Sequence, residues 1–232
     1  MKNVFIVVLV LLTKSLAIGQ TAPDAMALLR EVNKKFASVK DYQVDALIDA
    51  RISFLKILPQ RAKVYFKSPD KFRVKSKGIA ILPKQNFDQL FQLMADEKAY
   101  MAFVTGNESQ NGKMVTILNL IPLSDTTDLV LAKIWVDTAR DLIVKSQLTT
   151  KSNGTVLIDY VHGNLSDYAL PDKMIFTIDV KRFKIPKAIA ADINSKSTAE
   201  PNKKEPKTGQ IIISFSNYIF NKGLSDEYFK KD

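Results

Sequence analysis

The hydrophobic and polar positions along the chain change period several times, and each period predicts one kind of element. In residues 24 to 39 (DAMALLREVNKKFASV), apolar side chains recur three and four positions apart. This spacing predicts an amphipathic helix with one buried stripe. The stripe consists of Leu28, Leu29, Val32, Phe36 and Val39.

Strict alternation follows in residues 42 to 54, where every second side chain is apolar. Period two over this length predicts a long strand with one buried face. The same pattern predicts strands at residues 61 to 67 and 71 to 77, joined by a turn at Pro69-Asp70. The side chains expected to point inward include Val44, Ile48, Ile52, Val64, Phe66, Phe72 and Val74.

Helical spacing returns in residues 84 to 97 (KQNFDQLFQLMADE), directly after Pro83. The apolar positions fall at i, i+3, i+4 and i+7, which predicts a second amphipathic helix. Its inner face consists of Phe87, Leu90, Phe91 and Met94.

From residue 99 onward the chain alternates again, with short connections between the predicted strands. A turn is expected from Asn107 to Gly112, and Asn153-Gly154 is a strong hairpin signal. This order of strands and turns predicts an antiparallel meander. Together with the earlier strands the count reaches about nine or ten, enough to curve an open sheet. The fold class is therefore α+β.

The first 19 residues have the layout of a cleavable secretory signal. Lys2 precedes an apolar run at 4 to 12, and small residues stand at Ala17 and Gly19. Such a run is too short to span a bilayer, so we expect cleavage near Gly19/Gln20 and export to a bacterial periplasm. Residues 20 to 232 should then form a single domain. Within it, residues 194 to 209 lack large apolar side chains and predict a mobile Lys/Pro-rich loop.

The lack of cysteine and the net positive charge reduce the number of functions that the chain can have. The chain has no cysteine, which excludes disulfides and thiolate chemistry. The formal net charge of +10 suits an anionic partner. Since export disfavours nucleic acid, a lipid surface or a secreted protein is left. A basic surface is expected on the predicted hairpin, at Lys63, Lys67, Arg73, Lys75 and Lys77.

The sequence offers few candidate catalytic residues. His162 is the only histidine, and its YVHGN context predicts an exposed residue at a turn. A single histidine cannot form a multi-histidine metal site, and no nucleophile elbow, phosphate loop, dinucleotide fingerprint or EF-hand loop occurs. Asp45 and Asp49 lie ~13 Å apart along one strand, too far for a glycosidase pair. We expect no catalytic residues, no metal and no cofactor.

Two interpretations of the sheet remain open from the residues alone. In the first, the helices seal the sheet and the core is solid. In the second, the sheet is too large for two helices to fill, and a cavity takes a hydrophobic ligand. Each buried methylene of an acyl chain would then contribute ~0.8 kcal/mol.

The order of these segments resembles the bacterial outer-membrane lipoprotein carrier family, the LolA- and LolB-like proteins. The similarity lies in a helix such as ALLREVNKKFASVKDYQ before a long strand, and in RAKVYFKSPDKFRV as a strand–proline turn–strand hairpin. It extends to IWVDTARDLIVKSQLTTKSNGTVLIDY as a central meander and GQIIISFSNYIFNKGLSDEYF as a closing strand with a tail. Together these segments span most of residues 24 to 229.

The resemblance implies an unclosed, strongly curved antiparallel β-barrel, a half-barrel, with helices on or plugging its concave face. The cavity would shelter acyl chains, and the inward residues named above would line it. One departure concerns the hairpin: Ser68 stands where the enteric carrier has an arginine that latches the lid. Serine is too short to make the forked hydrogen bonds of an arginine.

Three hypotheses follow. The first is a monomeric, non-catalytic periplasmic carrier of lipoprotein or lipid acyl chains, with inner- and outer-membrane components of a sorting pathway as further partners. The second is a sensor or interaction module on the same fold that binds a protein partner or senses lipid. The third is an envelope enzyme.

Overall fold

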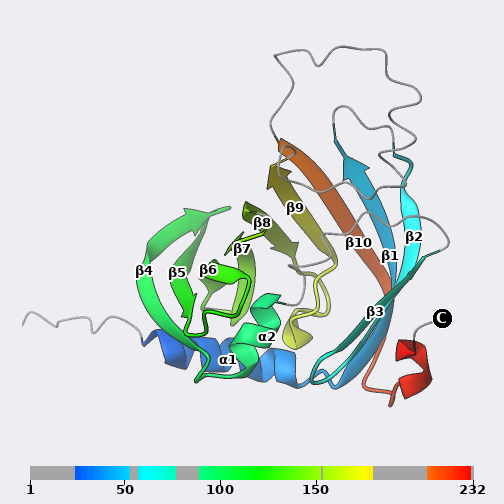
Figure 1. Ribbon diagram of the computed structural model, residues 1–232, viewed down its shortest axis with the longest axis horizontal. Helices are drawn as coiled ribbons and strands as arrows, with labels where there is room; N and C mark the ends of the chain where they lie inside the picture. The colour runs from blue at the N-terminus through cyan, green and yellow to red at the C-terminus, as the bar shows by residue number, and fades with distance from the viewer. Residues whose placement is uncertain (1–23, 53–56, 77–88, 153, 180–207, 231–232) are drawn as a thin grey trace, which may run out of the picture.

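The structure is a computed structural model that describes residues 24–52, 57–76, 89–152, 154–179 and 208–230. This part of the chain forms two α-helices, ten β-strands and two short 3₁₀ turns (Figure 1). The helices are α1 (Ala25–Ala37) and α2 (Gln89–Ala95), and the 3₁₀ turns are η1 (Ser166–Tyr168) and η2 (Asp226–Phe229). The strands are β1 (Asp41–Arg51), β2 (Gln60–Lys67), β3 (Lys71–Ser76), β4 (Tyr100–Gln110), β5 (Lys113–Pro122), β6 (Leu129–Asp137), β7 (Leu142–Thr150), β8 (Gly154–Val161), β9 (Lys173–Asp179) and β10 (Thr208–Phe220).

All ten described strands belong to one antiparallel sheet, in the order β3-β2-β1-β10-β9-β8-β7-β6-β5-β4. The two ends of this order, β3 and β4, do not pair with each other, so the sheet is an open half-barrel. The sheet curls around the two helices (Figure 1). The predicted half-barrel with helices on its concave side is confirmed.

The last strand connects the two parts of the sheet. β10 lies between β1 and β9, with Ile48 opposite Ile213 and Ile213 opposite Met174. All three side chains are buried, because each points to the concave face. The segment that the sequence predicted as a closing strand is therefore the central link between the N-terminal hairpin and the meander.

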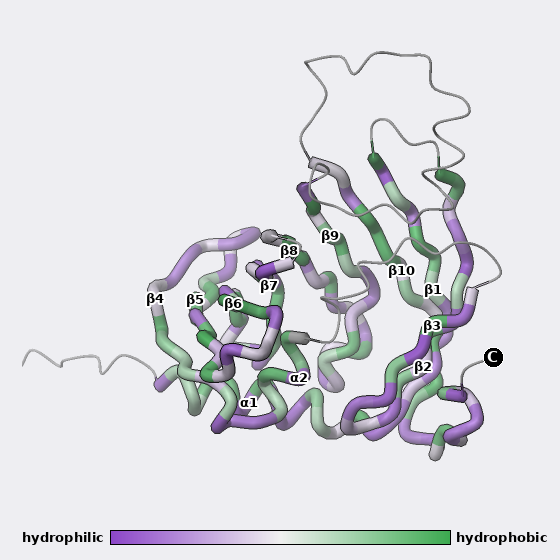
Figure 2. The backbone as a smooth tube through the Cα atoms, viewed as in Figure 1, coloured by the Kyte–Doolittle hydropathy of each residue, from purple (hydrophilic) through white to green (hydrophobic). Residues whose placement is uncertain are grey.

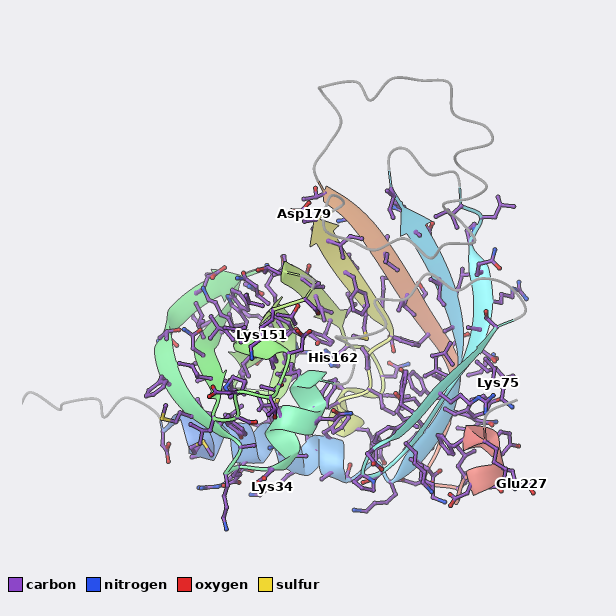
Figure 3. All side chains as sticks on the ribbon, viewed as in Figure 1. Lys34, Lys75, Lys151, His162, Asp179 and Glu227 are labelled. Atoms are coloured by element: carbon purple, nitrogen blue, oxygen red, sulfur yellow. The ribbon has the colours of Figure 1, made fainter. Side chains whose placement is uncertain are left out.

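Helix α1 begins at a side-chain cap and ends in a basic turn. The carboxylate of Asp24 accepts a hydrogen bond from the Met26 N–H at 3.0 Å, which satisfies a helix N–H that has no partner within the helix. Lys34 and Lys35 stand in the last turn, where positive charge is favourable. Figure 3 shows Lys34 pointing away from the sheet.

Helix α2 is anchored to α1 rather than to a strand edge. The side-chain amide of Asn33 donates to the Met94 carbonyl oxygen at 2.9 Å, and Leu90 and Met94 are buried beneath it. The amide thereby satisfies one carbonyl at the open C-terminal end of a short helix. Neither helix in the described part of the chain combines the length and apolar character that a membrane crossing needs.

Two predicted boundaries are wrong. The turn expected from Asn107 to Gly112 is confined to Asn111-Gly112, because β4 continues to Gln110. Both turn residues have positive φ, 50° and 77°, which fits the right-handed twist of a two-residue hairpin. Also, β10 begins at Thr208, inside the stretch predicted as a loop. The rest of that loop, the signal segment and residues 84–88 of the predicted second helix lie outside the described residues.

The chain end packs against the outer side of the β2–β3 hairpin. The Asp226 carboxylate in η2 lies 2.6 Å from Lys67 Nζ and 2.7 Å from Lys71 Nζ. The ring of Tyr228 stacks on Tyr65 with 4.9 Å between ring centroids. Figure 2 shows the hairpin tip and this end of the chain as largely hydrophilic. The predicted tail is thus a docked element.

We expect Phe176→Ala to lower the free energy of unfolding by about 3–5 kcal/mol, because Phe176 has 0% exposure in the centre of β9 and its loss leaves a cavity. Urea denaturation followed by circular dichroism measures this change. Phe103→Ala is the matched control, because Phe103 is 49% exposed; it should cost at most about 0.5 kcal/mol. Equal costs for the two variants would contradict this account of the core.

Candidate functional site

A cavity of about 370 Å³ lies between the two helices and one part of the concave face. Its lining comes from both helices and the residues that follow them, the β2–β3 hairpin, the segment after β8 and the strands β1, β7, β8, β9 and β10. Ligand pockets in proteins usually measure ~300–1,000 Å³ and are mostly apolar. The dimensions therefore fit a site for one small apolar ligand.

Six aromatic rings form one continuous wall of this cavity. Each ring contacts the next, with centroid separations of 4.4, 5.9, 5.2, 5.8 and 6.0 Å, in the range of attractive aromatic pairs. The rings come from α2, α1, β2, β1 and β10, so the wall joins both helices to the sheet. In order they are Phe91, Phe36, Phe66, Tyr42, Tyr218 and Phe215.

The phenols near the cavity are neutral at physiological pH. Burial raises the pKa of Tyr42 and of Tyr218 above the ordinary range, and it raises the pKa of Tyr160 to about 12. The Tyr218 hydroxyl donates to the Pro171 carbonyl oxygen at 2.8 Å, and the Tyr160 hydroxyl lies 3.0 Å from Ser146 Oγ. These partners satisfy the buried hydroxyls within the protein.

His162 lies in the cavity wall, so the prediction of an exposed turn residue is wrong. It is half-buried just after β8, and Figure 3 shows it between α2 and the strands. Burial, aided by the positive charges of Arg140 and Lys35, lowers its pKa to about 4. Its Nδ1 is buried and has no hydrogen-bond partner among the described residues. The ring is therefore uncharged at neutral pH.

Two carboxylates stand at the mouth of the cavity. The exposed lining residues lie at the hairpin tip, at the end of α1 and in or just after α2, and the charged ones among the described residues are Asp70 and Glu97. Glu97 also pairs with Arg30, whose Nε lies 3.0 Å from the carboxylate. No lysine or arginine belongs to the described lining.

The structure divides the predicted cavity residues into three groups. Phe66, Phe72, Phe91 and Met94 line the cavity. Packed in the core beside it are Val44, Ile48, Ile52, Val64 and Leu90. Val74 is half-buried and packs against that core, while Phe87 lies outside the described residues. Alternation predicts the face on which a side chain lies, but the helices decide which part of that face stays uncovered.

Several residues that line the cavity were not predicted to do so. Phe36 belongs to the recognised stripe of α1 and Tyr42 begins the alternation of β1, so both were visible as inward positions. Phe215 and Tyr218 come from the far end of β10. Their approach to Tyr42 depends on the β1–β10 pairing, for which the local pattern gives no signal.

The residues of the predicted basic surface differ in their surroundings. Lys63 pairs with Asp45 at 2.8 Å, and Lys67 pairs with Asp226. Arg73 is half-buried and Lys75 is exposed, whereas Lys77 lies outside the described residues. Figure 3 shows Lys75 near η2, on the outer side of the hairpin. The chain's own carboxylates therefore neutralise part of this surface.

Ser68 stands at the edge of the cavity, in the turn between β2 and β3. Its backbone N–H donates to the Lys40 carbonyl oxygen at 2.8 Å. The side chains that connect α1 with the hairpin at this point are the rings of Phe36 and Phe66, 5.9 Å apart. An apolar contact thus joins helix and hairpin beside the serine.

No catalytic arrangement is evident in the described residues. No group of three or more histidine, aspartate or glutamate side chains there is placed to hold a metal ion. The hydroxyls of Ser146 and Tyr160 bond to each other, next to an uncharged histidine. The site offers apolar surface and neutral polar groups for binding.

Comparison with solved structures shows the same architecture in other proteins. A LolA superfamily protein from Nitrosomonas europaea aligns with a TM-score of 0.58 and 14% identity, over 90% of this chain and 99% of that one. A domain assigned to outer membrane lipoprotein sorting, from Vibrio parahaemolyticus, aligns with a TM-score of 0.58 and 13% identity, over 88% and 95%. A DUF1329 family protein from Desulfovibrio piger reaches 0.54 with 13% identity, over 89% and 95%.

These likenesses define the class of fold, an open antiparallel half-barrel of the LolA type. The chain is a divergent example of it, since identities of 13–14% leave the fold as the shared property. No protein-family model and no curated protein sequence matches the chain.

Acidification should destabilise the protein through His162. The unfolded chain takes up a proton near the ordinary pKa of ~6.5, whereas the folded chain does so near pH 4. Stability should therefore fall by about 1–3 kcal/mol as the pH drops from 6.5 to 4. Urea denaturation at a series of pH values measures this loss.

The variant His162→Phe lacks the titrating group and keeps a ring in the cavity wall. It should lose less stability than the wild type over the same pH range, although its stability at pH 7.5 can differ from that of the wild type. Parallel pH profiles for the two proteins would show that His162 titrates normally.

Proposed function

We propose that this protein is a non-catalytic carrier that binds the acyl chain of a lipid or lipoprotein. The observation that supports this proposal is the cavity of about 370 Å³, whose continuous aromatic wall lies inside a half-barrel of the LolA type. A solid core would have left the rings packed against aliphatic neighbours, with no space between helices and sheet. The aromatic wall is mostly half-buried and therefore available to an apolar ligand.

The energetics favour a chain-like ligand. Each methylene moved from water into this site contributes ~0.8 kcal/mol, so a chain of about ten methylenes gains ~8 kcal/mol. Immobilising the ligand costs ~4 kcal/mol or more, which leaves a net affinity suited to reversible transport. The phenols and His162 add no net charge that the chain would have to displace.

The proposal also includes export of the protein to the periplasm. Residues 1–19 act as a signal peptide that is cleaved near Gly19/Gln20, and residues 20–232 work as one domain in the periplasm. The carrier then moves its cargo toward the outer membrane, receiving it from an inner-membrane component and passing it to an outer-membrane one. The LolA-type fold supports this setting, and the apolar run at 4 to 12 supports export.

We expect Phe66→Asp to lower the affinity for a fluorescent acyl-chain probe at least tenfold, because it places a charge in the aromatic wall. Probe titration measures the affinity, and circular dichroism verifies the fold. Phe103→Asp is the matched control, since Phe103 is an exposed strand residue outside the cavity lining. It should bind the probe as the wild type does.

A second variant keeps the proposal testable if Phe66→Asp fails to fold. Phe91→Ser removes one ring of the stack from α2 and leaves the sheet intact. Weaker probe binding is expected again. Unchanged binding in folded Phe66→Asp and Phe91→Ser proteins would mean that the chain does not bind here, and the carrier function would be refuted.

A further inference from the structure

The size of the cavity limits how much of a lipid it can hold. A methylene group occupies about the same volume as a liquid water molecule, ~30 Å³. The volume of about 370 Å³ therefore accommodates roughly a dozen methylene-sized groups. This volume corresponds to one acyl chain of medium length within the described lining.

The charged side chains at the mouth of the cavity restrict the charge that a lipid head group can carry. The exposed end of the lining is where a head group would remain in contact with water, and its charged side chains in the described residues are Asp70 and Glu97. Arg30 pairs with Glu97 at 3.0 Å, so the negative charge without an ion-pair partner among the described lining residues is that of Asp70. An anionic head group placed there meets like charge at short range. It would also find no lysine or arginine of the described lining.

The nearest basic side chains of the hairpin are held on its other side. Lys67 and Lys71 flank the turn, but both ammonium groups bind the Asp226 carboxylate, at 2.6 and 2.7 Å. On the opposite wall, Lys35 donates to the Arg140 carbonyl oxygen at 2.6 Å, and Arg140 pairs with Asp137. Neither Lys35 nor Arg140 belongs to the cavity lining.

The interior provides no cation either. His162 is the single basic side chain in the described lining, and burial together with Arg140 and Lys35 lowers its pKa to about 4. A carboxylate drawn into the cavity would therefore lose its hydration without gaining a counter-charge. An ester or amide head group has a much smaller penalty, because it carries no net charge to desolvate.

We propose that the cavity binds one acyl chain of about twelve carbons whose head group carries no negative charge, and that it selects against free fatty acids. The Asp70 carboxylate at the mouth, the lack of a lysine or arginine in the described lining and the volume of the cavity carry this selectivity. It rests on the proposed acyl-chain binding and adds chain number, chain length and head-group charge. A two-chain lipid would place only one of its chains in the site.

The experiment titrates delipidated protein at pH 8 with monoacylglycerols of 8 to 18 carbons, each below its aggregation concentration, and follows displacement of the uncharged dye Nile red. Affinity should rise about fourfold per added methylene. Beyond about twelve to fourteen carbons, the rise should fall below twofold per methylene. The fatty acid of the same length should bind at least tenfold more weakly than its monoacylglycerol, and the matching diacylglycerol no more tightly.

A charge-reversal variant tests the role of the mouth directly. Asp70→Lys, at an exposed turn position, should reduce the preference for monoacylglycerol over fatty acid at least threefold. Asp125→Lys makes the same change of charge at an exposed residue outside the cavity lining, and it should leave the preference unchanged. An equal effect of the two variants would mean that the overall charge, and not the mouth, sets the selectivity, which would overturn the proposal.

Other outcomes separate this inference from the function on which it rests. Affinity that keeps rising fourfold per methylene up to 18 carbons, or equal binding of fatty acid and monoacylglycerol, overturns the inference but leaves the carrier function in place. Tighter binding of diacylglycerol than of monoacylglycerol has the same consequence. If no lipid of any length or head group displaces the dye, the carrier function itself is refuted.

Discussion

The antiparallel pairing of β1 with β10 is the constraint on which the remaining structure depends. It brings together residues that are far apart in sequence, from Tyr42 opposite Phe220 to Arg51 opposite Gln210. Through it, the N-terminal hairpin and the long meander become one sheet instead of two. Three of the six rings in the cavity wall lie on these two strands, and a fourth lies on β2 beside them. Since such pairing closes a long loop, it carries an entropic cost, which the backbone hydrogen bonds and the buried side chains between the strands, among them Ile48, Ile211 and Ile213, help to offset.

The cavity results from a mismatch between a large curved sheet and two short helices. α1 has 13 residues and the described part of α2 has seven, so together they cover only a portion of ten strands. Where the helices lie against the sheet, Leu29, Val32, Leu90 and Met94 are buried. Around the cavity, half-buried rings on the helices and on the neighbouring strands remain, and they contact each other. An apolar ligand is the natural complement of such a surface, because it removes the same rings from water.

The sequence predicted the fold more completely than the site. The alternation in β1 and the heptad-like spacing in α1 predicted their element types and buried faces correctly, because these depend on local periodicity. Phe66, Phe72, Phe91 and Met94 were recognised as inward residues and line the cavity, but neighbours such as Val44 and Ile48 have the same local pattern and lie in packed core. The position of His162 in the cavity wall was not predicted, because it depends on α1 and α2, which line the same cavity and are distant in sequence. Similarly, nothing local to Tyr218 indicates that Tyr42 will lie 5.8 Å away.

η2 packs on the β2–β3 hairpin and supplies Asp226 as the counterion of Lys67 and Lys71. Asp226 holds two ammonium groups on the convex side, and the lysines hold the pKa of this carboxyl at about 2, so the arrangement persists through moderate acidification. On the concave side of the same two strands, Phe66 and Phe72 face a cavity whose described lining contains no lysine or arginine. A single layer of backbone thereby separates an ionic surface from an apolar one. The hairpin therefore presents charged side chains on its convex side and apolar side chains on its concave side. Asp226 keeps both ammonium groups on the convex side.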